Sequence, residues 1–501
     1  MRLVNGSPVF APSDLITFLE SPFASWMDRA LLQGETDATP DPPRADMALL
    51  ARKGDEHEQA WLASLRAGGK DIWDGTPFKN DLPATIAAMH AGHEVLYQPY
   101  LAHGGFAGLA DFLVRVPGAS RLGDFHYEIH DTKLAKKAKA YFLVQLCAYA
   151  DMIEAIQGVR PRLVHVVNGE RVALSFRTDD YWFFYRTVRD GLLALQRSYD
   201  AKGERPLPHP RANHRRWQSH ADAVLDAADH PVRVAGITSG QITKLANVGI
   251  TTLGALATTS LARVPKIEDA AFARLRAQAR LQRASAGRNT PLHELAPTEP
   301  GCGLALLPPA SKLDVYFDME GYPLVEGGLE YLFGATVLER GKPRFHDWWA
   351  HDSAQEKVAF EAFIDWAVAR HRSDRAMHIY HYAPYEVTAM RRLAGKYGTR
   401  EAEVDELLRA EVFVDLYRIV RQGIRVGEPR YSLKNVEHLY RGARSGDVSN
   451  RPSCRRATTA TSSPLANSAT RAAHQPSRCL TIAARDRARG IAHGPSTNGH
   501  P

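Results

Sequence analysis

One stretch of the sequence, residues 104–150, constrains the fold more strongly than any other. Residues 106–116 form an apolar, partly β-branched run, which is typical of a strand. Pro117, Gly118 and Ser120 then supply the residue types of a turn. A second apolar run and an amphipathic segment complete the stretch. We therefore expect a strand, a turn, a strand and a helix in this order, within an α/β domain.

Each of the two predicted strands carries ionised side chains among apolar ones. Asp111 interrupts the first strand, and Asp131 and Lys133 lie on the second. An ionised carboxylate within an apolar strand is unfavourable unless it is paired or binds a cation. Two such acids on adjacent strands favour a divalent metal ion with oxygen ligands, Mg²⁺ or Mn²⁺, whose charge lowers the pKa of a bound water. Because strand side chains alternate, Lys133 lies on the face of Asp131, where it could position the attacking water or stabilise charge on a phosphate.

The competing interpretation of this pair is an ordinary surface ion pair, because Asp-x-Lys arises easily by chance. A second copy, Asp200 to Lys202, lies where a predicted helix runs into a Gly/Pro-rich link, with no apolar strand around it. The helix predicted over residues 141–150 favours a site at the first copy, since its Gln145 and Tyr149 are four residues apart and share one face.

These residues resemble the motifs of the RecB-type branch of the PD-(D/E)XK nucleases. The matching segments are Gly108–Asp111, Asp131–Lys133 and Gln145–Tyr149, with Ala110 where the family name has proline. The resemblance implies a restriction-endonuclease-like mixed-sheet core. In it the two aspartates hold the metal, the lysine acts on the water or the phosphate, and the Gln/Tyr pair braces the site.

The same branch places a histidine on an upstream helix as a further metal ligand. Residues 47–67 predict such a helix, and His57 is the matching residue. The alternative interpretation of His57 is an ordinary surface histidine on a helix.

Many nucleases of this branch also tie the domain together with an iron–sulfur cluster. Its ligands are one cysteine in the first helix and three after the core. The equivalent positions here are Ser21, Ala212, Arg215 and Ala221. None of them can supply a thiolate, so we expect no iron–sulfur cluster. A zinc site built on His214 and His220 is the weaker alternative.

Residues 205–284 predict a linker followed by a small helical segment. Residues 234–238 (VAGIT) are echoed by residues 247–251 (NVGIT). Short helices joined by such turns resemble a helix-hairpin-helix module, which presents backbone N–H groups to nucleic-acid phosphates without reading sequence. A helical spacer is the alternative, and residues 285–311, rich in proline and glycine, predict a second linker.

A second acidic strand begins the domain predicted over residues 312–450. Asp318 and Glu320 are two residues apart in an apolar strand, so they share one face. Glu386, at the start of a later helix, is a third candidate acid. Paired carboxylates at a strand end fit two-metal phosphodiester cleavage, in which the ions lie roughly 4 Å apart. Ordinary charges at strand ends and helix starts are the alternative.

The order of these elements resembles the DnaQ-type, RNase H-like exonuclease fold. Asp318 and Glu320 match its first motif, and Glu386 stands where its second motif usually has aspartate. Asp415 matches a position that is more often structural. The final acid of the family, in a Tyr-x-x-x-Asp context after Asp447, is absent. The resemblance therefore implies a truncated, catalytically incomplete domain.

Residues 451–501 differ abruptly from the rest of the chain. They contain eight arginines, one aspartate, no lysine, and no Phe, Tyr, Trp, Val or Met. Such a segment cannot bury enough apolar surface to order itself, so we expect a disordered tail. Our hypothesis is a frameshifted reading frame, which the downstream DNA in the other two frames would test. A basic nucleic-acid-binding tail is the alternative.

The whole chain limits the classes of function. Its 501 residues are too many for a single core, and its net charge of +7 suits a polyanionic partner. No apolar run reaches the ~18 residues of a membrane helix, and the N-terminus lacks a signal-peptide pattern. We therefore expect a cytoplasmic protein without membrane contact. No Gly-x-x-x-x-Gly-Lys-Ser/Thr motif occurs, so any helicase would be a separate partner.

Together these features predict a multidomain α/β protein. Its expected parts are a nuclease core over 1–204, a linker and helical segment over 205–284, a linker over 285–311, an RNase H-like domain over 312–450 and a disordered tail over 451–501. The expected function is Mg²⁺-dependent hydrolysis of DNA, single-stranded or at duplex ends, or of RNA, in DNA repair or processing. The alternatives are a non-catalytic nucleic-acid-binding scaffold and a 3′–5′ exonuclease acting through the RNase H-like domain.

Overall fold

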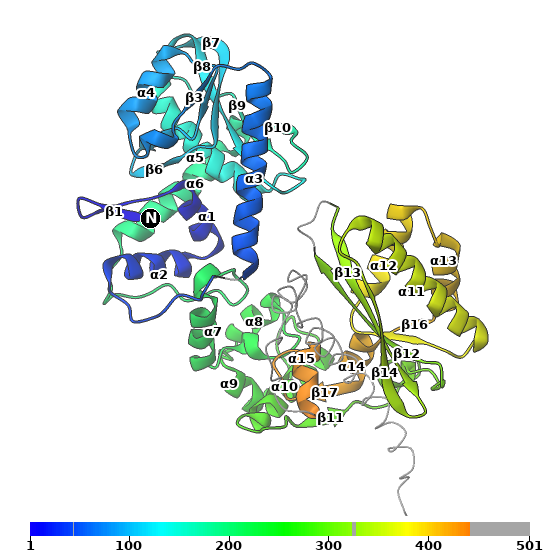
Figure 1. The fold of residues 1–501 in the computed structure, drawn as a ribbon. Coiled ribbons are helices and arrows are strands. Elements are labelled where there is room, and N and C mark those ends of the chain that lie inside the picture. Colours follow the sequence, from blue (N-terminus) through cyan, green and yellow to red (C-terminus); the bar gives the residue numbers. More distant parts are fainter. Residues whose placement is uncertain (44, 323–326, 441–501) are drawn as a thin grey trace, which may run out of the picture. The chain divides into compact units, whose positions relative to one another are not determined.

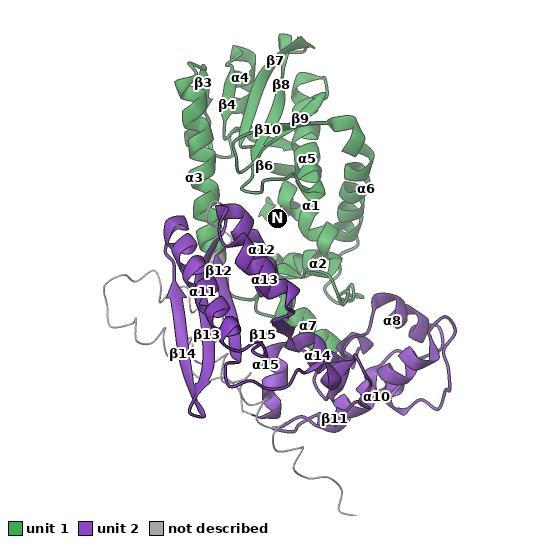
Figure 2. Ribbon diagram, turned by 90° about the vertical axis from the view of Figure 1, so that its right-hand side faces the viewer, with its two compact units in different colours: residues 1–228 green, residues 229–501 purple. Residues whose placement is uncertain are grey.

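The computed structural model describes residues 1–43, 45–322 and 327–440. The chain divides into two compact units, residues 1–228 and 229–501 (Figure 2). This division, with its boundary after Ala228, confirms a multidomain α/β chain. The final acid expected beyond Asp447 and the tail over 451–501 lie outside the described residues.

Unit 1 is built on a six-stranded mixed sheet (Figure 1). Neighbouring strands pair antiparallel, except β3 with β4 and β8 with β9, which pair parallel. The strands, in their order across the sheet, are β10 (Ala173–Arg177), β9 (Leu163–Val167), β8 (Gly123–Thr132), β7 (Phe112–Ser120), β4 (Val95–Tyr97) and β3 (Ile72–Asp74).

The first predicted strand, residues 106–116, is divided in two. β6 (Phe106–Leu109) pairs with β5 (Tyr100–His103) in a separate two-stranded sheet, whereas β7 pairs with β8 in the main sheet. The chain passes from the small sheet to the main sheet at Ala110, whose N–H donates to the Pro99 carbonyl at 3.1 Å. Asp111 therefore lies in the connection between two strands and not inside one.

The turn predicted at residues 117–120 is also wrong, because these residues belong to β7. The register of β7 on β8 shifts between Pro117 and Ser120, and the chain turns at residues 121–122 instead. A bulge accommodates a proline, which has no N–H, and a glycine, here Gly118 at φ 143°. The residues that predicted a turn, Pro117, Gly118 and Ser120, therefore lie at a β-bulge.

Helices cover both faces of the main sheet (Figure 1). One face, which carries Leu113 and Ile129, packs on α5 (Ala140–Gln157), together with α1 (Pro12–Glu20) and α6 (Thr178–Arg197). The other face carries Phe112, which packs on Leu62 of α3 (Ala45–Ala67). Both helices predicted near the site, over 47–67 and 141–150, are confirmed. The remaining helices of unit 1 are α2 (Pro22–Gln33), α4 (Leu82–Ala91), α7 (Gln218–Ala227) and the 3-10 turns η1 (Thr76–Phe78) and η2 (Arg215–Trp217).

Residues after position 204, expected in a linker, pack onto unit 1. Trp217 is fully buried against Phe23 and Met27 of α2, and its indole N–H donates to Asp28 at 2.8 Å. This burial explains why the boundary falls after Ala228 and not before the tryptophan.

Unit 2 begins with a small helical segment around its own apolar core. It contains η3 (Pro231–Arg233), α8 (Ser239–Ala246), α9 (Leu253–Thr258) and α10 (Asp269–Ser285). The repeated turns have the same backbone conformation, with Gly236 and Gly249 both at φ 80°, which favours glycine. Thr238 caps α8 and forms a capping box with Gln241.

A five-stranded sheet forms the rest of unit 2. Its order is β14 (Lys342–Trp349), β13 (Leu329–Glu339), β12 (Val315–Tyr322), β15 (Ile379–His381) and β16 (Phe413–Asp415). The first three strands form an antiparallel meander, and β15 and β16 run parallel to β12. The strand predicted at Asp318 is therefore confirmed.

Helices cover both faces of this sheet as well. α11 (Ser353–Ser373), α12 (Tyr385–Tyr397) and α13 (Glu401–Arg409) share one core with one face, while α14 (Leu416–Gly423) and η4 (Gly303–Leu306) cover Tyr316 and Tyr380 on the other. β17 (Ile424–Val426) pairs with β11 (His293–Leu295), and α15 (Leu433–Val436) and η5 (Glu437–Leu439) follow. No helix of the described residues is both long and apolar enough to cross a membrane.

Candidate active sites

The carboxylates of unit 1 meet where β8 ends. Asp131 is the penultimate residue of β8 and is 1% exposed, and its Oδ2 lies 2.5 Å from Lys133 Nζ. Asp111 accepts two hydrogen bonds at Oδ2, from the Thr132 N–H and the Thr132 hydroxyl, each at 2.7 Å. Residues 131–133 thus bring the two sequence-predicted acids and the lysine together. β8 ends at Thr132, so Lys133 lies just beyond the strand on which it was expected.

Two acids of this cluster, Asp111 and Asp131, act on one cation, the ammonium of Lys133. Burial, and then the charge of Asp111, raise the pKa of Asp131 to about 7, while Lys133 opposes the shift. Burial lowers the pKa of Lys133, but the two aspartates outweigh it, so the net shift is upward. Oδ2 of Asp131 pairs with Lys133, and no other described residue donates a hydrogen bond to it. A buried carboxylate oxygen left in this state, beside a second carboxylate, fits a divalent cation.

A third acid, Glu58, belongs to this cluster and was missed from the sequence. It lies on α3, and burial and then Asp111 raise its pKa. Its Oε1 accepts a hydrogen bond from the Gln98 side chain at 2.6 Å, and its charge also acts on Asp131. One signal could have identified it. Glu58 is four residues before Leu62, so it lies on the face of α3 that packs on the sheet.

His57 lies beside the same strand end, but within the described part of the chain no hydrogen bond or ion pair joins it to either aspartate. Its Nε2 is 3.4 Å from the Val167 carbonyl, which also accepts the Lys133 N–H at 2.8 Å. Among the described residues no three His, Cys, Asp or Glu side chains lie close enough to form a ready metal cluster. The role of His57 as a ligand stays a prediction.

Gln145 and Tyr149 of α5 support the connection that carries Asp111. The Tyr149 hydroxyl donates to the Leu109 carbonyl at 2.6 Å, and Gln145 hydrogen-bonds to the tyrosine. Burial, followed by the charges of the two aspartates, raises the pKa of Tyr149, so it stays a neutral donor. A Cβ at Gly108 would lie 3.0 Å from this hydroxyl, which explains a small residue there.

Three of the four positions that the resemblance compares with iron–sulfur ligands, Ser21, Arg215 and Ala221, make other contacts. The Ser21 hydroxyl and His214 Nδ1 are 2.7 Å apart, and burial lowers the pKa of His214, which favours its neutral form. Ala221 is buried in the core shared with α2, and Arg215 pairs with Glu20 at 2.9 Å. A serine–histidine hydrogen bond and apolar packing thus join the first helices to the segment after the core. That the protein has no cluster stays a prediction.

The acids of unit 2 are placed at one edge of its sheet. Asp318 and Glu320 point to the same side of β12 and are half-buried. Because β12 and β15 are parallel, their carboxyl ends lie at the same edge, where α12 begins with Glu386 in its first turn. Glu386 is 4% exposed, and its Oε2 is 3.5 Å from His381 Nδ1. Asp415 accepts hydrogen bonds from the Ala383 and Tyr417 N–H groups, which is a structural role.

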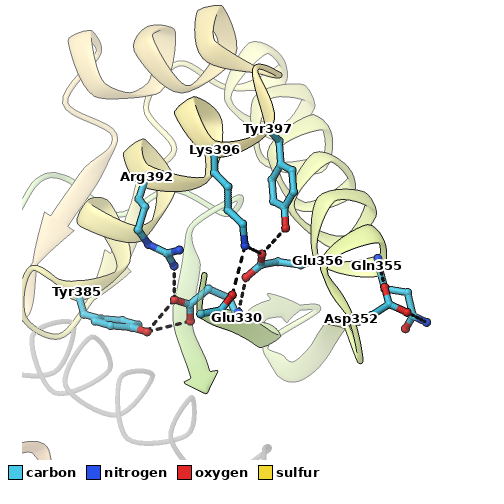
Figure 3. Close-up of polar contacts among 9 residues, drawn as sticks. Glu330, Asp352, Gln355, Glu356, Tyr385, Arg392, Lys396 and Tyr397 are labelled. Carbon is cyan, nitrogen blue, oxygen red and sulfur yellow. Dashed lines mark hydrogen bonds and ion pairs between the residues drawn. The ribbon is translucent and has the colours of Figure 1, made fainter. Parts of the chain in front are cut away.

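A network around two buried acids, also missed from the sequence, joins residues along the whole of α12 to β13 and α11 (Figure 3). The Tyr385 hydroxyl lies 2.9 and 2.8 Å from the two carboxylate oxygens of Glu330, which also pairs with Arg392 at 2.5 Å. Glu356, fully buried, accepts from Lys396 at 2.6 Å and from the Tyr397 hydroxyl.

This network also borders the strand that carries Glu320. A Cβ at Gly321 would lie 2.3 Å from Glu330 Oε2 and 2.4 Å from the Tyr385 hydroxyl. Any side chain at Gly321 would therefore displace the network. The network thus fixes the backbone on both sides of the site, next to Glu320 on β12 and next to Glu386 on α12.

Comparison with known proteins bears on the second unit. No curated protein matches the chain. Residues 315–455 match the RNase H superfamily. This match and the strand order β14-β13-β12-β15-β16 together show that the C-terminal domain of the chain is RNase H-like.

Proposed function

We propose that the protein is a metal-dependent nuclease that hydrolyses phosphodiester bonds of DNA through the cluster in unit 1. One observation carries this proposal, namely the buried Asp131, which pairs with the ammonium of Lys133 and is also acted on by the charge of Asp111. A purely structural ion pair would not need a second carboxylate beside it. Buried acids with raised pKa values gather where a cation is bound or protons are moved.

Each residue has a distinct part in this proposal. Asp111 and Asp131 hold Mg²⁺ or Mn²⁺, with His57 as a further ligand, and Glu58 adds negative charge at the same place. The ion, when bound, acidifies a water and neutralises charge on the phosphate. Lys133 orients that water or stabilises the phosphate, and Gln145 and Tyr149 keep the connection at Asp111 in place.

The second candidate is a 3′–5′ exonuclease of the DnaQ type acting through Asp318, Glu320 and Glu386. The RNase H superfamily match and the common edge of these three acids favour it. The resemblance to the helix-hairpin-helix module supports nucleic-acid binding by residues 234–251 in either case. A role in DNA repair or processing, a separate helicase partner and a cytoplasmic location remain part of the proposal.

The test is a cleavage assay with Mg²⁺ on single-stranded DNA, duplex DNA and RNA. Asp131→Ala and Lys133→Ala abolish cleavage on our proposal, whereas Asp318→Ala does not. Lys202→Ala, in the second Asp-x-Lys copy, is the matched control and leaves cleavage unchanged. Loss of cleavage only with Asp318→Ala would assign the activity to the RNase H-like domain. An inactive wild-type protein would favour the alternative of a non-catalytic nucleic-acid-binding scaffold.

A further inference from the structure

Unit 2 contains a groove of about 680 Å³ that is separate from the acids of β12 and α12. One wall is α10 and the other is the segment from Tyr417 to Ser432, which includes β17. These elements lie side by side in Figure 1, and α10 is in contact with β17. The groove is therefore shared by the helical segment and the RNase H-like domain.

The groove is strongly basic. Four arginines line it, Arg274 from α10 and Arg421, Arg425 and Arg430 from the opposite wall, and none of its described lining residues is acidic. Arg425 pairs with Glu294 at 2.5 Å outside the lining. The other three are exposed and have no hydrogen bond or ion pair with any described residue. Several unpaired cations facing one space create a positive potential that attracts a polyanion.

The walls of the groove are held in place by polar contacts. Gln278 of α10 is 5% exposed and donates to the Val426 carbonyl at 2.8 Å. Tyr431 donates its hydroxyl to Gln278 at 3.2 Å, and β17 pairs with β11. Hydrogen bonds thus hold the backbone of both walls of the groove in place.

Tyrosines connect the groove to the edge of the sheet that carries the acids. Tyr417 and Tyr431 line the groove, and Tyr382 contacts both of them. Its ring is edge-on to that of Tyr417, with centroids 5.6 Å apart, and its hydroxyl donates to the Tyr431 carbonyl at 2.6 Å. Tyr382 directly follows β15, whose carboxyl end lies beside Glu386. Aromatic rings beside a cationic track are the features that bind unpaired nucleotides.

We propose that this groove binds a single strand of nucleic acid through its phosphates and leads it to the edge of the RNase H-like sheet. The choice of nucleic acid as the polyanion rests on the proposed function. The binding itself requires neither metal site, so it can be measured without cleavage.

The test is fluorescence anisotropy of a labelled oligo(dT) with the full-length protein in EDTA. The groove variant is Arg274→Gln/Arg421→Gln/Arg430→Gln. Arg263→Gln/Arg340→Gln/Arg391→Gln is the control, because these arginines are also exposed, belong to the same unit and do not line the groove. Both variants change the net charge equally, and neither replaces a buried side chain.

We expect the groove variant to lose at least about 10-fold in affinity, and its slope of log K against log salt to fall by about 2, since each phosphate contact contributes roughly 0.7. The control keeps the wild-type slope. Equal losses in both variants, or an unchanged slope in the groove variant, would overturn the proposal. So would competition by polyglutamate as effective as that by oligo(dT). Failure of the proposed function would instead appear as cleavage that survives Asp131→Ala, with the binding result unaffected.

Discussion

Replacing Lys133 by alanine removes the cation that lies 2.5 Å from Oδ2 of the buried Asp131. Breaking a buried ion pair usually costs about 3–5 kcal/mol, because the remaining charge is left uncompensated. Asp131 can avoid this cost by taking up a proton, since burial and Asp111 already raise its pKa from 3.8 to about 7. The loss of stability should therefore depend on pH.

The sign of this dependence follows from the protonation of the carboxyl group. A carboxyl with a raised pKa in the folded protein stabilises the fold at low pH, and this contribution is lost as the pH rises through that pKa. Without Lys133 the pKa of Asp131 rises further, so the variant keeps its proton above pH 7, where the wild type ionises. The difference in the free energy of unfolding should be small near pH 5. Above neutrality it should grow by up to about 1.4 kcal/mol per pH unit, to a ceiling of about 3–5 kcal/mol.

The assay is urea unfolding of the full chain in EDTA. Unfolding is monitored through the hydrogen exchange of peptides from β8 and β9. This readout reports on unit 1 alone. Mg²⁺ at 100 times its Kd should restore ~2.7 kcal/mol, because the ion replaces part of the missing charge. Lys202→Ala should match the wild type in its pH dependence and in its response to Mg²⁺, since its site is intact. A difference between wild type and Lys133→Ala that is the same at low and high pH would refute the reasoning.

Three further predictions concern single residues. Burial and the neighbouring His165 lower the pKa of His130 to about 3, so its neutral form stabilises the fold above pH 6.5, and this contribution is lost as the pH falls toward 3. His130→Gln should reduce the acid-induced loss of stability, seen as a smaller shift of the urea midpoint between pH 7 and pH 5; an unchanged shift would contradict the assignment. Gly321→Ala should displace Glu330 and destabilise unit 2 by about 1–3 kcal/mol; calorimetry would show a lower Tm for that unit alone, and an unchanged Tm would exclude the close approach. Tyr149→Phe should cost about 0.5–1.5 kcal/mol through the lost hydrogen bond to Leu109, and should slow cleavage while unit 1 stays folded; full activity would contradict a bracing role.

Local patterns in the sequence predicted the parts of unit 1 that depend on neighbouring residues. The spacing of two residues placed Asp131 and Lys133 on one side of the chain, and their charged groups are 2.5 Å apart, although Lys133 lies just beyond the end of β8. The spacing of Gln145 and Tyr149 likewise placed both on one face of α5. These features need only the periodicity of a strand or a helix.

Features that depend on distant partners could not be predicted in the same way. Asp111 leaves the strand because β6 pairs with β5 and not with β8. Glu58 was missed because its place in the site depends on how α3 packs against the sheet. The ion pairs of Glu330 with Arg392 and of Glu356 with Lys396 join residues 62 and 40 positions apart, and no local pattern marks such partners.

The most direct measurement of the central claim is a crystal structure of the protein soaked in Mn²⁺, with an anomalous difference map. Our account predicts a peak within coordination distance of the carboxylates of both Asp111 and Asp131. It also predicts that the peak is lost in Asp131→Ala. A map of the wild-type protein with no peak between these two side chains, at a Mn²⁺ concentration that supports cleavage, would contradict it.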